Sequence, residues 1–450
     1  MLDLKVVGGT LVIPGTGRVR AGVGIRDGVV AAIGRDDQLP AARRTVDAAG
    51  RFVLPGIIDP HIHLGVRASF EDEAASETKA ALLGGVTTVG VFLREKESYL
   101  PIFNRLRAAI DSRSSVDVVF HATLCIPRHL DEVPAYARDL GITSFKMYLC
   151  GVTGIIEHVT DDFLYAGLCR VAALGPRAVM AVHAENAMLV EAGIAKVKEM
   201  TGGTLADWHE AHPDMAEEEA IMRAAYLAGR AGARLYVVHL TSAMGLERLR
   251  RIRAGARHVH AETTSAYLSL DESHPMGLLL KRFPPVRSAA DVEALWTGVR
   301  DDTIDTIGTD NVTSTRAANQ PEKGIWLARG GYGGLHTHLP VLLHEGVHRR
   351  GVSLDRLVEK ITAGPARVFG IYPRKGTIAV GSDADLTVVD LDLERRVDPA
   401  ESPSRGDFSP YDGMTLKGWP VATIKSGVLC VQDQRFVGDR LLGRYLPRAA

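Results

Sequence analysis

The stretch LPGIIDPHIH, residues 54–63, marks the point where the sequence changes character. Before it, short β-rich runs are separated by Gly-Gly, Pro-Gly and Asp-Gly pairs, as in the hairpins of an antiparallel sheet. After it, apolar strand-like runs alternate with helical patterns such as EEEAIMRAAYLAGRAG, residues 217–232. The stretch therefore predicts the first strand of an alternating β/α domain.

Seven further strand-like runs continue this alternation. The eight runs are 54–63, 86–93, 116–125, 144–149, 178–185, 234–241, 258–268 and 303–310. Eight β/α units in roughly 250–300 residues are typical of an α/β TIM barrel, (β/α)8, which we predict over 54–373. Because β-rich sequence returns near the end, 1–53 and 374–450 are predicted to form a small composite β-sandwich. A doubly wound open sheet is the alternative, and it explains the β-rich ends less well.

Composition limits the possible partners and location of the chain. Its 53 basic and 54 acidic residues give a net charge of -1, which argues against a nucleic acid or a membrane surface held by bulk electrostatics. The apolar runs are too short to span a bilayer, and MLDLKVVGGTLV lacks the features of a signal peptide. The four cysteines are scattered without a CxxC pair. We therefore expect a cytoplasmic protein.

Polar residues fall at the ends of the predicted strands, where barrels of this kind carry their chemistry. These residues are His61, His63, Lys146, His183, His239 and Asp310. Taken alone, a strand histidine is more often a hydrogen-bonded core residue than a ligand, and an aspartate after a strand is often a turn residue. Five strand ends that all carry a titratable or metal-competent group favour one shared site.

The residue types indicate the kind of metal centre. Nitrogen and oxygen ligands without cysteine suit Zn²⁺, Mn²⁺, Fe²⁺ or Co²⁺. Four histidines and an aspartate exceed the three protein ligands of a single tetrahedral ion with an open position, but they suit two ions that share a bridging hydroxide. Lys146, in ITSFKMYLCG (142–151), would be unfavourable inside a strand if it stayed unpaired. Its neutral amine can add CO₂, and the resulting carbamate can bridge both ions.

The stretches LPGIIDPHIHL, SFKMYL, VHAEN, VVHLTS, FPPVR, IGTDN and GPARVFGIYPRKGTIAVGSDADLTVVD resemble, in order, the landmarks of the amidohydrolase superfamily. More narrowly, they are similar to the cyclic amidohydrolases: hydantoinases, dihydropyrimidinases and allantoinases. The resemblance implies a binuclear centre, usually of zinc. His61 and His63 would hold the more buried ion with Asp310, His183 and His239 the more exposed ion, and carbamylated Lys146 would bridge them. It also implies a homo-oligomer, a tetramer or a dimer.

The implied reaction is hydrolysis of the amide bond of a small cyclic amide or imide, such as a hydantoin or a dihydropyrimidine. The bridging hydroxide attacks the carbonyl, and Asp310 transfers the proton to the leaving nitrogen as general base and acid. Alternatives are an allantoinase-like or other cyclic imide or lactam hydrolase, a hydrolase of acyclic amides or lactones, and a non-enzymatic dihydropyrimidinase-like scaffold. All six ligand positions are filled, which disfavours the scaffold.

The sequence departs from the hydantoinase pattern around the substrate. Gly151 stands where a tyrosine supports the oxyanion, and Tyr148 is the nearby tyrosine on the face of Lys146. Phe283 replaces a serine before Pro-Pro, Asn311 replaces a histidine, and His336 replaces Glu or Gln. We expect Tyr148, Phe283, Asn311 and His336 to contact the substrate, and Phe283 and Tyr148 suggest a flatter or more apolar ring than a simple dihydropyrimidine.

One further departure concerns dihydroorotases, which carry an arginine two residues after the second metal histidine. Gly65 occupies that position here and argues against a dihydroorotase. Arg67 is close by, but a charged loop residue of this kind is more often simply solvated.

Overall fold

Eight parallel strands form a barrel in chain order in the computed structural model, which describes all residues except 153–154, 201, 257 and 439–440. The strands are β8 (Ile57–Ile62), β9 (Val86–Leu93), β10 (Asp117–Thr123), β11 (Ser144–Tyr148), β12 (Val179–His183), β13 (Leu235–Val237), β14 (Val259–Thr264) and β15 (Thr306–Gly308). Their residues are almost all buried, as expected for strands covered on both faces. The predicted TIM barrel is confirmed, and the doubly wound alternative is wrong because the sheet closes on itself.

The closure between the last and first strands lies beside the predicted site. Ile62 and Asn311 form a parallel bridge, and the backbone N–H of His63 donates to the Asn311 carbonyl at 2.9 Å. The Asp59 carboxylate accepts bonds from the N–H (3.1 Å) and the hydroxyl (2.6 Å) of Thr309. These bonds hold the end of β8 against the segment that follows β15.

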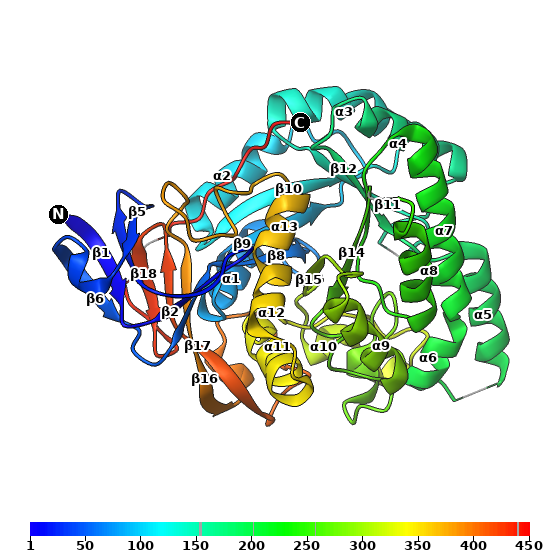
Figure 1. Cartoon of the computed structure of the whole chain (residues 1–450). Helices are drawn as coiled ribbons and strands as arrows, with labels where there is room; N and C mark the ends of the chain where they lie inside the picture. Colours follow the sequence, from blue (N-terminus) through cyan, green and yellow to red (C-terminus); the bar gives the residue numbers. More distant parts are fainter. Residues whose placement is uncertain (153–154, 201, 257, 439–440) are drawn as a thin grey trace.

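Helices surround the barrel and follow its strands in turn (Figure 1). They are α1 (Phe70–Leu83), α2 (Phe103–Arg113), α3 (Pro127–Leu140), α4 (Asp161–Ala172), α7 (Asp214–Ala231), α8 (Ala243–Arg253), α9 (Ala289–Arg300), α12 (Leu354–Ile361) and α13 (Ala363–Val368). α5 (Ala187–Met200) and α6 (Leu205–Ala211) are inserted between β12 and α7, and α10 (Arg316–Asn319) and α11 (His338–Leu342) follow β15. In the described part of the chain, no helix is long and apolar enough to span a membrane.

Two further sheets come from the chain ends. One has the order β5-β4-β1-β6 and the other β19-β18-β17-β16-β7-β2-β3. Their strands are β1 (Leu2–Val7), β2 (Thr10–Ile13), β3 (Gly17–Arg20), β4 (Gly22–Arg26), β5 (Val29–Gly34), β6 (Ala42–Asp47), β7 (Phe52–Pro55), β16 (Leu386–Arg396), β17 (Thr415–Lys425), β18 (Val428–Gln432) and β19 (Arg435–Phe436). One apolar core joins both sheets, so the composite arrangement is confirmed; in Figure 1 the blue and the orange-red strands lie side by side.

The structure corrects two details of the predicted strands. The N-terminal hairpins β2–β3 and β4–β5 are antiparallel, but β6 and β7 return parallel to β1 and β2, so the sheets are mixed. The stretch 54–63 is two strands and not one, because β7 pairs with β16 and only β8 enters the barrel. Gly56 separates them, and a Cβ there would lie 2.1 Å from Thr87 Oγ1.

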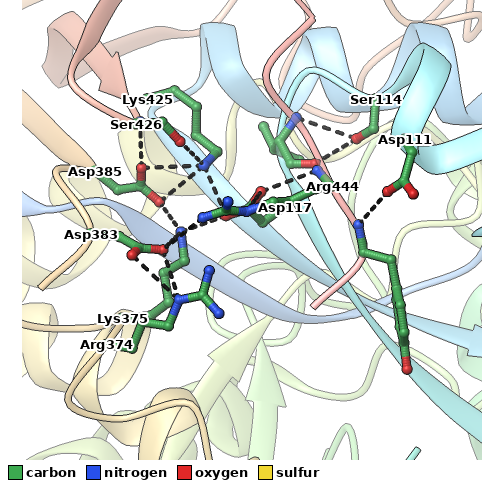
Figure 2. A network of polar contacts seen from close by, with 12 residues as sticks. Asp111, Ser114, Asp117, Arg374, Lys375, Asp383, Asp385, Lys425, Ser426 and Arg444 are labelled. Atoms are coloured by element: carbon green, nitrogen blue, oxygen red, sulfur yellow. Dashed lines mark hydrogen bonds and ion pairs between the residues drawn. The ribbon is translucent and has the colours of Figure 1, made fainter. Parts of the chain in front are cut away.

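A buried ion cluster joins the sandwich to the barrel (Figure 2). Lys375 Nζ lies 2.5 Å from Asp117 at the start of β10 and 2.5 Å from Asp385 just before β16. Lys425, at the end of β17, lies 2.8 Å from the same Asp117 oxygen. Both ammonium groups and both carboxylates are almost fully buried, so each charge is balanced inside the protein.

The C-terminal segment lies across the amino ends of the barrel strands. The Val118 N–H donates to the Arg444 carbonyl at 2.9 Å, and the Leu446 N–H donates to the Val118 carbonyl at 2.8 Å. The Arg448 guanidinium is buried and donates to Ser144 Oγ at 2.8 Å. This segment therefore closes the end of the barrel opposite the predicted site.

Candidate metal centre

The six predicted ligands converge on one rim of the barrel. They are His61 in β8, His63 directly after it, Lys146 in β11, His183 at the end of β12, His239 two residues after β13 and Asp310 two residues after β15. All six are buried. His239 (φ 41°) and Asp310 (φ 50°) have left-handed backbone conformations, which are uncommon outside glycine and cluster at functional sites.

His61, His63 and Asp310 form one group of potential ligands. The Nε2 atoms of His61 and His63 lie 3.3 Å and 3.2 Å from Asp310 Oδ1, and all three ligand atoms lie within 4.8 Å of one another. His61 Nδ1 lies 2.8 Å from Glu262 Oε1. Among the described residues, His61 Nε2 has no hydrogen-bond partner. A carboxylate on one ring nitrogen and a free second nitrogen are typical of a metal-binding histidine.

His183 and His239 form a second group. His183 Nδ1 lies 3.1 Å from His239 Nε2, and His183 Nε2 lies 2.7 Å from Glu185 Oε2. Glu185 thus orients His183 in the way that Glu262 orients His61. The rings of His61 and His239 are 5.5 Å apart between centroids, so the two groups are neighbours and fit a centre with two ions.

Lys146 lies among these ligands without a polar contact of its own. Its Nζ is 5.1 Å from the Phe92 ring centroid and 5.0 Å from that of Tyr148, and it has no hydrogen-bond partner in the described part of the chain. Burial lowers the pKa of Lys146 to about 7, although Asp310 and Glu262 act in the opposite direction. A substantial share of the amine is therefore neutral near pH 7, in the form that reacts with CO₂.

Arg282 binds the oxygen of the Asp310 carboxylate that does not face His61 and His63. Its Nη2 donates to Asp310 Oδ2 at 3.1 Å and to the Thr309 carbonyl at 2.9 Å. Burial would raise the pKa of Asp310, but His61, His63 and Arg282 outweigh it and hold the pKa well below its ordinary value. The carboxylate is therefore ionised and fixed in position, as a metal ligand must be.

Sequence reasoning missed the residues that support the ligands: Glu185, Glu262 and Arg282. Glu262 carried a usable signal, since it is an acid inside a predicted buried strand, HAETTSAYL. Glu185 is two residues from His183 and faces the same side of the strand end. Arg282 belongs to an irregular segment, where no periodicity shows which way a side chain points.

A second group of three potential ligands, His209, Asp214 and Asp291, has another explanation. Asp214 Oδ1 accepts a bond from Arg287 Nη1 at 2.6 Å. Asp291 forms the capping box of α9 with Ser288. These contacts make the group a network of caps and ion pairs.

A cavity of about 550 Å³ opens over the candidate centre. His63, His183, His239 and Asp310 contribute to its lining, together with the predicted substrate residues Tyr148 and Phe283. The ring of Tyr148 stacks beside that of His183, with 5.6 Å between centroids. A substrate in this cavity would thus meet both groups of ligands.

The position of the missing tyrosine has no room for a side chain. A Cβ on Gly151 would lie 2.9 Å from the Ile156 carbonyl oxygen. Tyr148 is therefore the tyrosine that the local backbone places at the cavity. Burial raises the pKa of Tyr148, so its hydroxyl stays protonated and able to donate.

Asn311 and His336 are not among the described residues that line this cavity. The Asn311 amide donates to Thr313 Oγ1 at 2.9 Å and accepts a bond from the Gly334 N–H at 2.7 Å. His336 Nε2 lies 3.0 Å from Gln434 Oε1, next to the sandwich. Their contact with a substrate stays a prediction.

Comparison with known proteins connects this geometry to a family. The model of the amidohydrolase family matches residues 52–430. The L-hydantoinase of Paenarthrobacter aurescens is 33% identical over 457 residues, which cover 100% of this chain and 98% of that protein. The D-hydantoinase of Geobacillus stearothermophilus is 32% identical over 470 residues, which cover 99% of this chain and 96% of that protein.

Solved structures of hydantoinases and dihydropyrimidinases are also similar to this chain over its whole length. The L-hydantoinase (dihydropyrimidinase) from Arthrobacter aurescens superposes with a TM-score of 0.93 at 32% identity, with 100% of both chains covered. The dihydropyrimidinase from Brevibacillus agri superposes with a TM-score of 0.91 at 28% identity, with 100% of this chain and 99% of the other covered. The chain therefore belongs to the amidohydrolase family, as a hydantoinase- and dihydropyrimidinase-like member of it.

Proposed function

We propose that this protein hydrolyses the amide bond of a cyclic amide or imide, a hydantoin, a dihydropyrimidine or a related ring, at a binuclear metal centre. The observation that carries the proposal is the convergence of both ligand groups on Lys146 at one buried rim. The names of its relatives, L-hydantoinase and D-hydantoinase, support the same class of substrate.

The residues present fit two divalent ions, zinc in the first place. His61, His63 and Asp310 would hold one, His183 and His239 the other, and a carbamate on Lys146 would bridge them. Among the described residues, neither His61 Nε2 nor Lys146 Nζ has a hydrogen-bond partner, which supports this assignment. Bound there, the ions would supply a Lewis acid and a water molecule of lowered pKa. Glu262 and Glu185 keep His61 and His183 turned toward the centre.

Asp310 is the proposed proton carrier. It accepts the proton of the attacking water and returns it to the ring nitrogen as the carbon–nitrogen bond breaks. Arg282 holds Asp310 during both transfers. The Tyr148 hydroxyl is the donor proposed for the developing oxyanion, and Phe283 contributes an apolar wall for the ring. The homo-oligomeric state and the cytoplasmic location stay predictions.

Metal analysis combined with a substrate panel tests the proposal. We expect about two ions per chain in protein purified without chelators, and hydrolysis of at least one ring among hydantoins, dihydrouracil, allantoin and cyclic imides. Chelation should abolish the activity, and Zn²⁺, Mn²⁺ or Co²⁺ should restore it. Fewer than about one ion per chain with no ring opened would contradict the proposal and favour a scaffold.

A further inference from the structure

The cavity over the centre has a strong excess of positive charge. Its lining includes six lysine and arginine side chains and one acid, Asp310. The basic residues are Arg67, Arg94, Lys198, Lys281, Arg282 and Arg329. The whole chain has a net charge of -1, so this excess is local and does not reflect a basic protein. A cleft lined by charge of one sign concentrates ligands of the opposite sign.

Two of these cations are already held by the protein. Arg282 is bound to Asp310 and to the phenol oxygen of Tyr332, at 3.1 Å and 2.8 Å. Lys281 Nζ donates to two backbone carbonyls and lies 4.1 Å from the Trp208 ring centroid. Both side chains therefore build the cavity wall, and groups of the protein already engage most of their donors.

Arg67 and Arg94 are different, because no ion pair holds either side chain in the described part of the chain. Arg94 directly follows β9, and Arg67 lies in the loop after β8. Within the described residues neither forms an ion pair, and the Nε atom of each is buried without a hydrogen-bond partner. Arg67 makes one bond, from Nη2 to the Gly330 carbonyl at 3.1 Å. Burial lowers the pKa of Arg67, and the charges of Arg329 and Arg94 lower it further, against the opposing charge of Glu73. Both guanidinium groups therefore lie close enough to Arg67 to repel it.

Glu73, in the first turn of α1, acts on the charge of Arg67 but forms no ion pair with it in the described structure. Its carboxylate accepts backbone bonds from Gly65 (2.6 Å), Val66 (3.3 Å) and Ala68 (3.1 Å). This clamp fixes the loop and points Arg67 into the cavity, whose lining it joins. The interpretation of Arg67 as a solvated loop residue is therefore not supported.

We propose, on the basis of the function proposed above, that the ring hydrolysed here carries a carboxylate substituent, which Arg67 and Arg94 bind beside the metal centre. Guanidinium groups match carboxylates in charge and in paired hydrogen-bond geometry. Trp208, Phe283 and Trp326 form an apolar part of the same lining and pack against the ring. Water supplies a hydroxyl group to the carbonyl carbon and a proton to the ring nitrogen, and the carbon–nitrogen bond between them breaks. The product is an open-chain dicarboxylate.

The test compares two rings of nearly equal size on the metal-loaded, full-length protein. Hydantoin-5-acetate carries the carboxylate, and hydantoin-5-acetamide is its neutral counterpart. We expect kcat/KM to favour the acid by roughly tenfold or more, the usual effect of a charged hydrogen bond. R67Q and R94Q should each lower this ratio about tenfold, mainly through KM of the acid. R177Q, which removes an exposed arginine before β12 at the opposite end of the barrel, should leave the ratio unchanged.

Equal kcat/KM values for the two rings, or a ratio that survives both R67Q and R94Q, would overturn the carboxylate site and leave the proposed function standing. If neither ring is opened, binding of hydantoin-5-acetate by calorimetry decides. Binding at least tenfold weaker in R67Q or R94Q, with R177Q unchanged, would retain the carboxylate site, and the metal analysis with the full ring panel would decide the proposed function separately. Equal affinity in all the variants would overturn the carboxylate site.

Discussion

Lys146 is the residue whose surroundings need the most explanation. An ammonium at this position has no hydrogen-bond partner among the described residues and faces the rings of Phe92 and Tyr148. Isolated buried charges are strongly unfavourable, and the neighbouring acids Asp310 and Glu262 are bound to other groups. A carbamate on this nitrogen, as proposed above, would remove the unfavourable charge and would give the two histidine groups a common ligand.

Replacing Lys146 with alanine should therefore empty the centre. We expect K146A to lose most of its metal, measured by mass spectrometry, and at least about a hundredfold in kcat/KM, since even indirect disturbance of a metal site costs 10–100-fold. Short carboxylic acids in CO₂-free buffer should restore part of the activity by supplying the missing bridge.

The matched control is K79A, which removes an exposed lysine from α1 and should keep its metal and its activity. Full metal content and activity in K146A would show that the bridging role is wrong.

At the level of elements, the short helix α6 connects the cavity to the outer part of the molecule. Its Trp208 lines the cavity and donates from Nε1 to the Arg282 carbonyl at 2.9 Å. The next residue, His209, points the other way, with Nδ1 2.5 Å from Glu272 and Nε2 3.2 Å from Asp214. These two ion pairs hold α6 in place and thereby position part of the cavity wall.

The ion pairs of His209 make this attachment depend on pH. Burial and the nearby Arg287 lower the pKa of His209, but Asp214 and Glu272 outweigh them and raise it above 6.5. A raised pKa means that the charged ring stabilises the folded state. This stabilisation is complete below pH 6.5 and is lost as the pH rises through the folded-state value.

H209Q should therefore unfold at lower urea concentration than the parent protein near pH 5.5 and should approach it near pH 9. Partly exposed ion pairs contribute about 0.2–1 kcal/mol each, which sets the expected difference in unfolding free energy between H209Q and the parent protein. H158Q, at an exposed histidine, is the control without these partners. A stability difference between H209Q and the parent protein that stays constant or increases toward high pH would contradict the assigned ion pairs.

The sequence predicted the elements better than their contacts. The runs 86–93 and 144–149 match β9 and β11 closely, because continuous apolar patterns mark strands that are buried on both faces. The run 54–63 was interpreted as one strand, since no local pattern shows that Gly56 passes the chain from the sandwich to the barrel. Likewise, the pattern placed the candidate ligands at strand ends, but it did not indicate Arg94 and Arg282, because the directions of these side chains depend on how the segments at the rim fold.

At the level of the whole molecule, a barrel and a sandwich are held together by charges from distant parts of the sequence. Asp117 begins a barrel strand, Asp385 and Lys425 belong to the sandwich, and Lys375 lies in the segment between them. No local pattern predicts such a cluster, since its members are brought together only when both units are folded. Burial opposes the charge on Asp385, but Lys375 and Lys425 outweigh it and keep its pKa low. The cluster therefore connects the barrel and the sandwich, and each buried charge in it is stabilised by the opposite charges of the others.

Removing one buried charge from this cluster should cost far more stability than removing an exposed one. K425M keeps the volume of the side chain but leaves Asp117 and Asp385 with Lys375 as their remaining buried cation. We expect the free energy of unfolding, from urea titration followed by fluorescence and circular dichroism, to fall by about 3–5 kcal/mol, as when one partner of a buried ion pair is lost.

Arg444 supplies the matched control within the same network. Its side chain is 53% exposed and lies 3.9 Å from Asp117 and 3.6 Å from Asp383, whereas the Lys425 side chain is 0% exposed. R444M should cost at most about 1 kcal/mol, because water already screens that charge. Its backbone N–H, which donates to Asp117 Oδ1 at 3.1 Å, is unchanged by the substitution. If K425M proved as stable as R444M, the buried charges would be dispensable for the attachment of the sandwich to the barrel.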